Sequence, residues 1–172
     1  MSPNIFIEDF ERTENSDYLH GVLGRCLIVA TRFDSMCTGL SMALEIRSGA
    51  VYLLNSDEDF NQFVTKVESK YRTLNSSIQS FSLPTELSET LHQARKSRNE
   101  VAHTLTKGME GCVDTKISNG DFINDVRGYI GDIVDGDIIV SLLMSKFNNE
   151  PVLNMQSLDG YKNKVINWVV EP

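Results

Sequence analysis

Residues that commonly bind metals are scarce in this chain of 172 residues, which contains three cysteines and three histidines. The cysteines, Cys26, Cys37 and Cys112, form no Cys-x-x-Cys pair, the spacing typical of zinc sites and redox centres. The histidines show no His-x-x-x-His spacing, which is typical of metal sites on helices. The sequence therefore predicts no metal site, no cofactor and free thiols, and we expect Cys26 and Cys37 to be buried like small apolar residues.

Long apolar runs are also absent. The longest run, IIVSLLM from Ile138, has seven residues and contains Ser141, whereas a helix needs about 20 apolar residues to span a bilayer. The first residues, MSPNIFIEDFERTENSD, are acidic and lack the basic segment and apolar stretch of a signal peptide. We therefore expect a protein that is not inserted in a membrane and that stays in the cytoplasm, where cysteines remain reduced.

The charge of the chain is strongly negative, with 24 acidic and 16 basic side chains and a net charge of −8. Residues 92–107 are an exception, because they hold four basic side chains and one acidic side chain. A local positive charge of this kind suits a cleft that binds phosphate. Outside such a cleft, the overall negative charge predicts weak and strongly salt-dependent binding to nucleic acid.

Most of the chain has the period of a helix. Apolar residues at steps of three and four predict a helix over residues 17–46. A second helix is predicted over residues 56–78, because Ser56 and Asp59 have the spacing of an N-terminal cap and three acids occupy the first turn. A third helix begins at Pro84, since proline fits the first turn, where its missing N–H costs nothing.

The rest of the chain follows the same pattern after an interruption. Glycines and the lack of any period predict a loop at about residues 108–120. Helical spacing resumes at Phe122 and continues to Phe147, with a break or kink expected near Asp135-Gly136-Asp137, and the segment LDGYKNKVINWVV predicts a last helix. The sequence thus predicts an all-α fold: an up-and-down helical bundle of four to five core helices in one domain, residues 1–172.

The third predicted helix has an arginine in an unusual place. At 100° per residue, one face is apolar, formed by Leu87, Leu91, Ala94, Val101 and Leu105. Arg98 lies near the centre of this face, about 140° from His103, whereas Asn99 and His103 are four residues apart on the polar side. A guanidinium among apolar residues needs an acidic partner, with Asp34 and Glu45 as candidates, or a second copy of the same helix against that face.

The segment Arg98-Asn99-Glu100-Val101-Ala102-His103 resembles the motif of the HEPN superfamily, which consists of Arg, a polar residue, three further residues and His. That superfamily is built on a bundle of four or five helices, with the motif toward the end of the third core helix. The resemblance implies a metal-independent endoribonuclease of toxin–antitoxin, abortive-infection or CRISPR systems, in which a homodimer brings two motifs into one cleft. Some members that a nucleotidyltransferase regulates have a tyrosine where this chain has Leu105, so the resemblance does not extend to that control.

The residue types of the motif suit RNA cleavage without a metal. The reaction needs a base for the 2′-hydroxyl, an acid for the 5′-oxygen and a cation for the charge on the phosphorane. We expect His103 to transfer protons, Arg98 to hold phosphate oxygens, and Asn99 to orient His103 or donate to phosphate. Arg95 and Lys96 are the expected substrate-binding residues. The products implied by the resemblance are a 2′,3′-cyclic phosphate and a 5′-hydroxyl.

Two other interpretations remain open at this point. The first is a catalytically silent HEPN-like module that binds a partner protein or a nucleotide in the same groove. The second is a helical interaction protein whose motif arose by chance, so that His103 is merely solvated, Arg98 is a structural ion-pair residue, and Arg95 and Lys96 belong to an ordinary charged face. For the nuclease, the expected partners are RNA, a second copy bound through the motif helix, and an antitoxin or defence-system protein.

Overall fold

The computed structural model describes residues 13–48, 54–107, 118–151 and 155–171, without the side chains of residues 155, 156 and 159. The described residues form helices and no strands, which confirms the predicted all-α bundle. The helices are α1 (Glu14–Arg47), α2 (Asp57–Lys70), α3 (Leu74–Ser80), α4 (Thr85–His103), α5 (Asn119–Phe147) and α6 (Met155–Val170). In this part of the chain, no helix combines the length and apolar character needed to cross a membrane.

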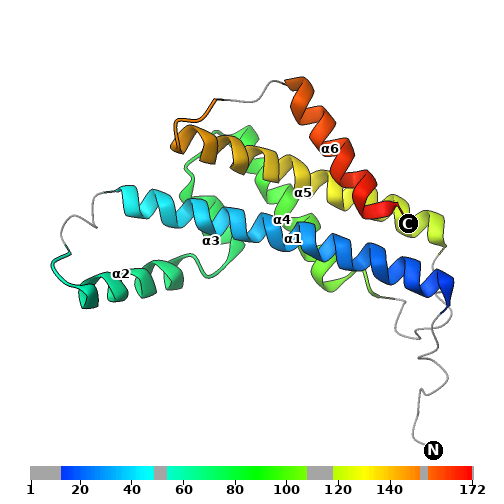
Figure 1. Cartoon of the computed structure of the whole chain (residues 1–172), viewed down its shortest axis with the longest axis horizontal. Coiled ribbons are helices and arrows are strands. Elements are labelled where there is room, and N and C mark those ends of the chain that lie inside the picture. The colour runs from blue at the N-terminus through cyan, green and yellow to red at the C-terminus, as the bar shows by residue number, and fades with distance from the viewer. Residues whose placement is uncertain (1–12, 49–53, 108–117, 152–154, 172) are drawn as a thin grey trace, which may run out of the picture.

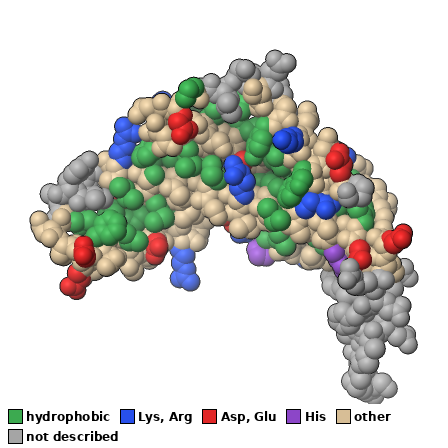
Figure 2. All heavy atoms as spheres, viewed as in Figure 1, with side chains coloured by type: hydrophobic (Ala, Val, Ile, Leu, Met, Phe, Trp, Pro, Cys, Tyr) green, Lys and Arg blue, Asp and Glu red, His purple; other side chains and the backbone are tan. Residues whose placement is uncertain are grey.

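Helix α1 runs along most of the length of the molecule, with α5 beside it and α3 and α4 behind it (Figure 1). Helix α6 lies at one end of this group and α2 at the other. Helix α4 packs most extensively against α5 and also contacts α1 and α3. Figure 2 shows hydrophobic side chains gathered where α2 lies beside the end of α1, and Phe60 of α2 is 44% exposed.

The core lies where α1, α4 and α5 meet, and Gly136 of α5 allows their close approach. A Cβ atom at Gly136 would lie 2.6 Å from Cβ of Ala94 and 2.9 Å from Cε2 of Phe33. Helix α5 continues through the Asp135-Gly136-Asp137 segment, so the break expected there is absent. The glycine removes side-chain volume between helices instead of interrupting one of them.

The second predicted helix is in fact two helices. As predicted, Ser56 caps the start of α2: its side chain accepts a hydrogen bond from the backbone N–H of Asp59, and the first turn has three acids. The helix ends at Lys70, and Thr73 and Ser76 then form a reciprocal capping box at the start of α3. The prediction was wrong here because apolar residues keep helical spacing across the break. The motif helix is therefore the fourth helix, α4.

The motif helix itself largely matches the prediction. It begins directly after Pro84, and of the five residues of its predicted apolar face, four are buried: Leu91, Ala94, Val101 and Leu105. Leu87 is 40% exposed, so its predicted burial was wrong. The predicted loop at about 108–120 falls mostly outside the described residues, and Asn119 already belongs to α5.

The two described cysteines are free and buried, as predicted. Burial raises the pKa of Cys26 to about 12 and also raises the pKa of Cys37, which leaves both thiols protonated and unreactive near neutral pH. Cys112 lies outside the described residues.

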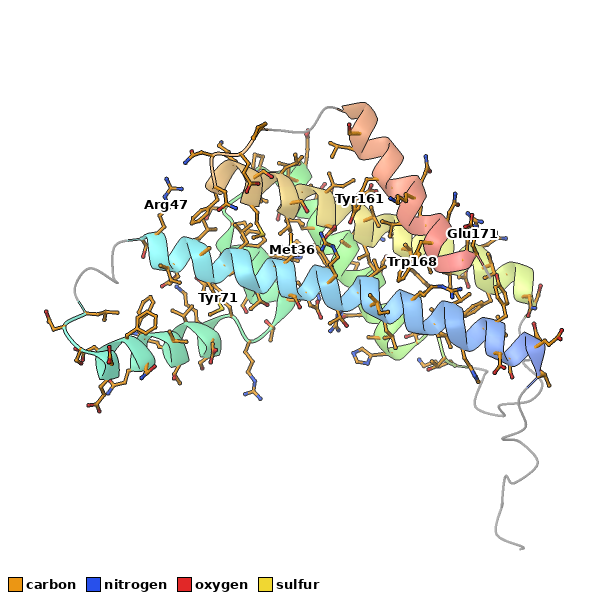
Figure 3. All side chains as sticks on the ribbon, viewed as in Figure 1. Met36, Arg47, Tyr71, Tyr161, Trp168 and Glu171 are labelled. Carbon is orange, nitrogen blue, oxygen red and sulfur yellow. The ribbon has the colours of Figure 1, made fainter. Side chains whose placement is uncertain are left out.

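Polar contacts join α6 to α1 and α5. Tyr161 of α6 points toward α1 and α5 (Figure 3), and its hydroxyl donates to Oδ2 of the buried Asp137 at 2.8 Å. Arg25 Nε of α1 donates to the backbone oxygen of Val169 at 2.8 Å, which satisfies a carbonyl at the C-terminal end of α6. These contacts fix α6 against α1 and α5.

Candidate functional site

Arg98 has an acidic partner within its own chain. Its Nε donates to Oδ2 of Asp34 at 2.8 Å, and its Nη2 donates to the same oxygen. The two side chains are 27% and 26% exposed. The other candidate, Glu45, accepts hydrogen bonds from Lys70 and Tyr71, and Tyr71 lies where the end of α2 meets α1 (Figure 3). Asp34 therefore accounts for an arginine on an otherwise apolar face.

The environment of Asp34 is electrostatically unfavourable for a carboxylate. Burial raises the pKa of Asp34, whereas the hydrogen bonds and positive charge of Arg98 act in the opposite direction. Its Oδ1 atom is buried and has no hydrogen-bond partner in the described part of the chain. A buried acceptor without a partner destabilises a folded protein, and groups of this kind are frequent at functional sites.

Arg98 keeps part of its hydrogen-bonding capacity. A guanidinium has five N–H groups, and Arg98 uses two of them for Asp34 and a third, on Nη1, for Oδ1 of Asn99 at 3.2 Å. The two remaining N–H groups, one on Nη1 and one on Nη2, have no partner among the described residues. They can donate to an anion that approaches Arg98.

The Arg98 side chain lines a polar pocket of about 340 Å³ between α1, α4 and the start of α3. Arg72 and Arg95 line the same pocket, so its described lining contains three arginines and one acid, Asp34. We call this the arginine pocket; its residues are Asp34, Thr38, Arg72, Thr73, Leu74, Asn75, Arg95, Arg98 and Asn99. Its side chains carry a formal charge of +2 in a protein whose net charge is −8. Positive charge in a concave site favours anions such as phosphate.

Sequence reasoning missed Arg72. This residue lay in the middle of a predicted helix, whereas the structure places it in the connection between α2 and α3, close in space to α4. A local signal existed, because Thr73 and Ser76 have the spacing of a helix N-terminal cap. That signal indicates where the helix breaks, but it does not indicate that Arg72 lines the same pocket as Arg95.

The structure brings together three of the five predicted site residues. Arg95, Arg98 and Asn99 line the arginine pocket, whereas His103, the last residue of α4, is exposed and does not line it. Asn99 lies one helical turn before His103 and is thus the pocket residue nearest to it along the helix. Lys96 lines a different surface, together with carboxylates of Glu89, Asp132 and Asp135. These acids oppose the binding of phosphate near Lys96.

A single chain thus presents a positively charged pocket whose described lining contains no histidine. In the described ranges, no group of three or more His, Cys, Asp or Glu residues is arranged to hold a metal ion. Comparison of the chain with known proteins finds no matching family model, no matching curated protein and no matching solved structure.

Proposed function

We propose that this protein is a metal-independent endoribonuclease of the HEPN type, which acts in the cytoplasm as a toxin or phage-defence component. The observation that supports it most is the position of Arg98 and Asn99 in the arginine pocket, one helical turn before the exposed His103. Guanidinium groups bind phosphate oxygens through charge-assisted hydrogen bonds. An imidazole near such a phosphate supplies the acid–base chemistry that RNA cleavage needs.

In the proposed reaction, the two unpaired N–H groups of Arg98 bind oxygens of the scissile phosphate, and Arg95 binds the substrate beside it. His103 accepts the proton of the 2′-hydroxyl, and the 2′-oxygen forms a bond to phosphorus while the bond between phosphorus and the 5′-oxygen breaks. The 5′-oxygen takes up a proton from water, and His103 releases the proton that it accepted to the solvent, so the products are a 2′,3′-cyclic phosphate and a 5′-hydroxyl. Proton transfer by a positioned side chain typically contributes 10²–10⁴-fold to the rate.

The proposal includes a homodimer formed through α4. Arg98 and His103 point about 140° apart on a regular helix, and His103 is exposed outside the arginine pocket. If two α4 helices meet about a two-fold axis, each His103 can approach the arginine pocket of the other chain. The exposure of His103 supports this arrangement because a buried imidazole would not be available to a partner.

A cleavage assay tests the proposal. We expect the purified protein to cleave single-stranded RNA in excess EDTA, and His103→Ala to lower the rate by at least about 100-fold because the proton-transfer group is lost. His20→Ala is the matched control, since His20 is also an exposed histidine but lies on α1. We expect this substitution to leave the cleavage rate unchanged. End-group analysis of the RNA products identifies the cyclic phosphate.

Two results count against the nuclease. One is loss of all activity in EDTA with recovery in Mg²⁺ or Mn²⁺, and the other is full activity of His103→Ala.

A second candidate function has its own support. The arginine pocket contains no histidine, and Asp34 already compensates the charge of Arg98. These two facts favour a catalytically silent module that binds a nucleotide or a partner protein. Such a module would bind nucleotide with the affinity of the wild type after His103→Ala, and the wild type would not cleave RNA.

A further inference from the structure

We infer that Arg72 and Arg95 form a phosphate subsite that holds one nucleotide in the arginine pocket, beside Arg98. If the nucleotide is a unit of an RNA substrate, the inference deepens the proposed function and rests on it. If the ligand is a free nucleotide, the inference does not depend on RNA cleavage. The shared ligand chemistry is a nucleoside phosphate.

The first observation is the position of Arg72. It belongs to the connection between α2 and α3, 23 positions before Arg95 in the sequence, yet both residues line the same pocket. Arg72 is exposed, and none of the described carboxylates forms an ion pair with it. Its positive charge is therefore not paired with an acid in the described part of the chain.

The second observation concerns Arg95. Its Nε atom is buried and has no hydrogen-bond partner in the described part of the protein. A buried donor without a partner costs free energy, and a phosphate that pairs with the charge of the Arg95 guanidinium would offset part of that cost. The pocket does not supply Arg95 with a free acid among the described residues, because the carboxylate of Asp34 is hydrogen-bonded to Arg98.

The remaining lining identifies the class of ligand. Asn75, Asn99 and two threonines add amide and hydroxyl groups around the guanidiniums, so the pocket suits a polar anion and not an apolar molecule. Its volume of about 340 Å³ lies at the lower end of the range for small-molecule sites, roughly 300–1,000 Å³. We conclude that the pocket takes one nucleotide at a time, with its phosphate between Arg72 and Arg95.

Titration calorimetry with each of the four nucleoside 5′-monophosphates, and with inorganic phosphate, tests the subsite directly. We expect Arg72→Gln to weaken the best-bound monophosphate by about tenfold or more, because a charge-assisted hydrogen bond is lost. Arg72→Lys keeps the charge and is expected to retain part of the affinity. Arg127→Gln is the matched control, since this exposed arginine of α5 undergoes the same change outside the pocket. The affinity of the Arg127→Gln variant for the monophosphate is expected to equal that of the wild type.

RNA cleavage distinguishes the two sources of the nucleotide. If the subsite holds a unit of the substrate, Arg72→Gln raises the KM for a short RNA by about tenfold and leaves kcat nearly unchanged. The bound monophosphate is then a competitive inhibitor of cleavage.

The possible failures are separable. Binding that depends on Arg72, without RNA cleavage by the wild type, supports the subsite for free nucleotides and refutes the nuclease. RNA cleavage with KM and monophosphate affinity unaffected by Arg72→Gln supports the nuclease and overturns the subsite. Absence of measurable binding of every monophosphate and of phosphate to the wild type also overturns it.

Discussion

Asp34 illustrates how a single residue can serve a site at the expense of stability. Its carboxylate positions Arg98 through two hydrogen bonds to one oxygen, while its other oxygen is buried without a partner among the described residues. Burial raises its pKa, which means that the folded protein holds the proton more tightly than the unfolded chain. The ionised form of Asp34 is therefore unfavourable in the folded state.

The pKa of Asp34 leads to a prediction about pH and stability. Because the folded pKa lies above the ordinary value of 3.8, the contribution of this residue is greatest at low pH and is lost as the pH rises through the folded pKa. Asp34→Asn removes the titration and keeps an oxygen acceptor for Arg98. We expect this variant to match the stability of the wild type below about pH 3.8 and to be more stable than the wild type at pH 7, as measured by urea unfolding.

The control for this prediction is Asp135→Asn. Asp135 is 40% exposed and pairs with Lys162 at 2.7 Å, so the same substitution there changes the free energy of unfolding by less than about 1 kcal/mol at both pH values. If Asp34→Asn is clearly less stable than the wild type at pH 7, the ion pair with Arg98 outweighs the burial of the carboxylate, contrary to our expectation.

The sequence predicted the pairing of Arg98 with an acid, but it could not predict the whole pocket, because part of the pocket depends on tertiary packing. An arginine on an apolar helix face requires an acid, and this requirement indicated Asp34 and Glu45 as candidates. The choice between them depends on Lys70 and Tyr71, which donate hydrogen bonds to the carboxylate of Glu45. Those hydrogen bonds exist only after α2 has packed against α1. Arg72 was missed for the same reason, because it reaches the pocket through a turn and not through a repeating pattern.

At the scale of whole helices, the packing of α5 against α1 and α4 depends on Gly136. We predict that Gly136→Ala destabilises the protein by about 1–3 kcal/mol, because the new methyl group would overlap Ala94 and Phe33. Gly128→Ala is the control on the same helix, where a Cβ atom would meet nothing within 4 Å. It is expected to stabilise the protein by about 0.5–1 kcal/mol through helix propensity.

Thermal and urea unfolding of the two alanine variants measure this difference. Opposite signs support the close-packing role of Gly136. Equal stabilisation by both substitutions would mean that the helices separate easily at Gly136, and that their close packing does not depend on the missing side chain.

The same helices show which features apolar periodicity predicts and which it does not. Apolar spacing correctly predicted α1, α4 and α6, because each buries one stripe of side chains. Apolar spacing gave a wrong prediction at Tyr71, where the apolar stripe continues although the helix ends. It was also wrong at Gly136, where a residue type that favours loops allows close contact between helices instead. In both places tertiary packing, which is not encoded in a local period, decides the outcome.

At the scale of the whole molecule, the proposed activity depends on two chains. One chain offers an arginine pocket with Arg98 and an exposed His103 outside it. An isologous contact between two α4 helices brings each His103 toward the pocket of the partner. Each active site would then contain the Arg98 of one chain and the His103 of the other.

Complementation between two inactive variants tests this claim most directly. We expect Arg98→Ala and His103→Ala to be inactive alone in the RNA cleavage assay. When they are mixed in equal amounts and allowed to exchange subunits, half of the dimers contain one chain of each kind, and one of the two sites in such a dimer is intact. We therefore predict about a quarter of the wild-type activity after mixing. No recovery in a mixture whose heterodimers are demonstrated by native mass spectrometry would contradict the shared site.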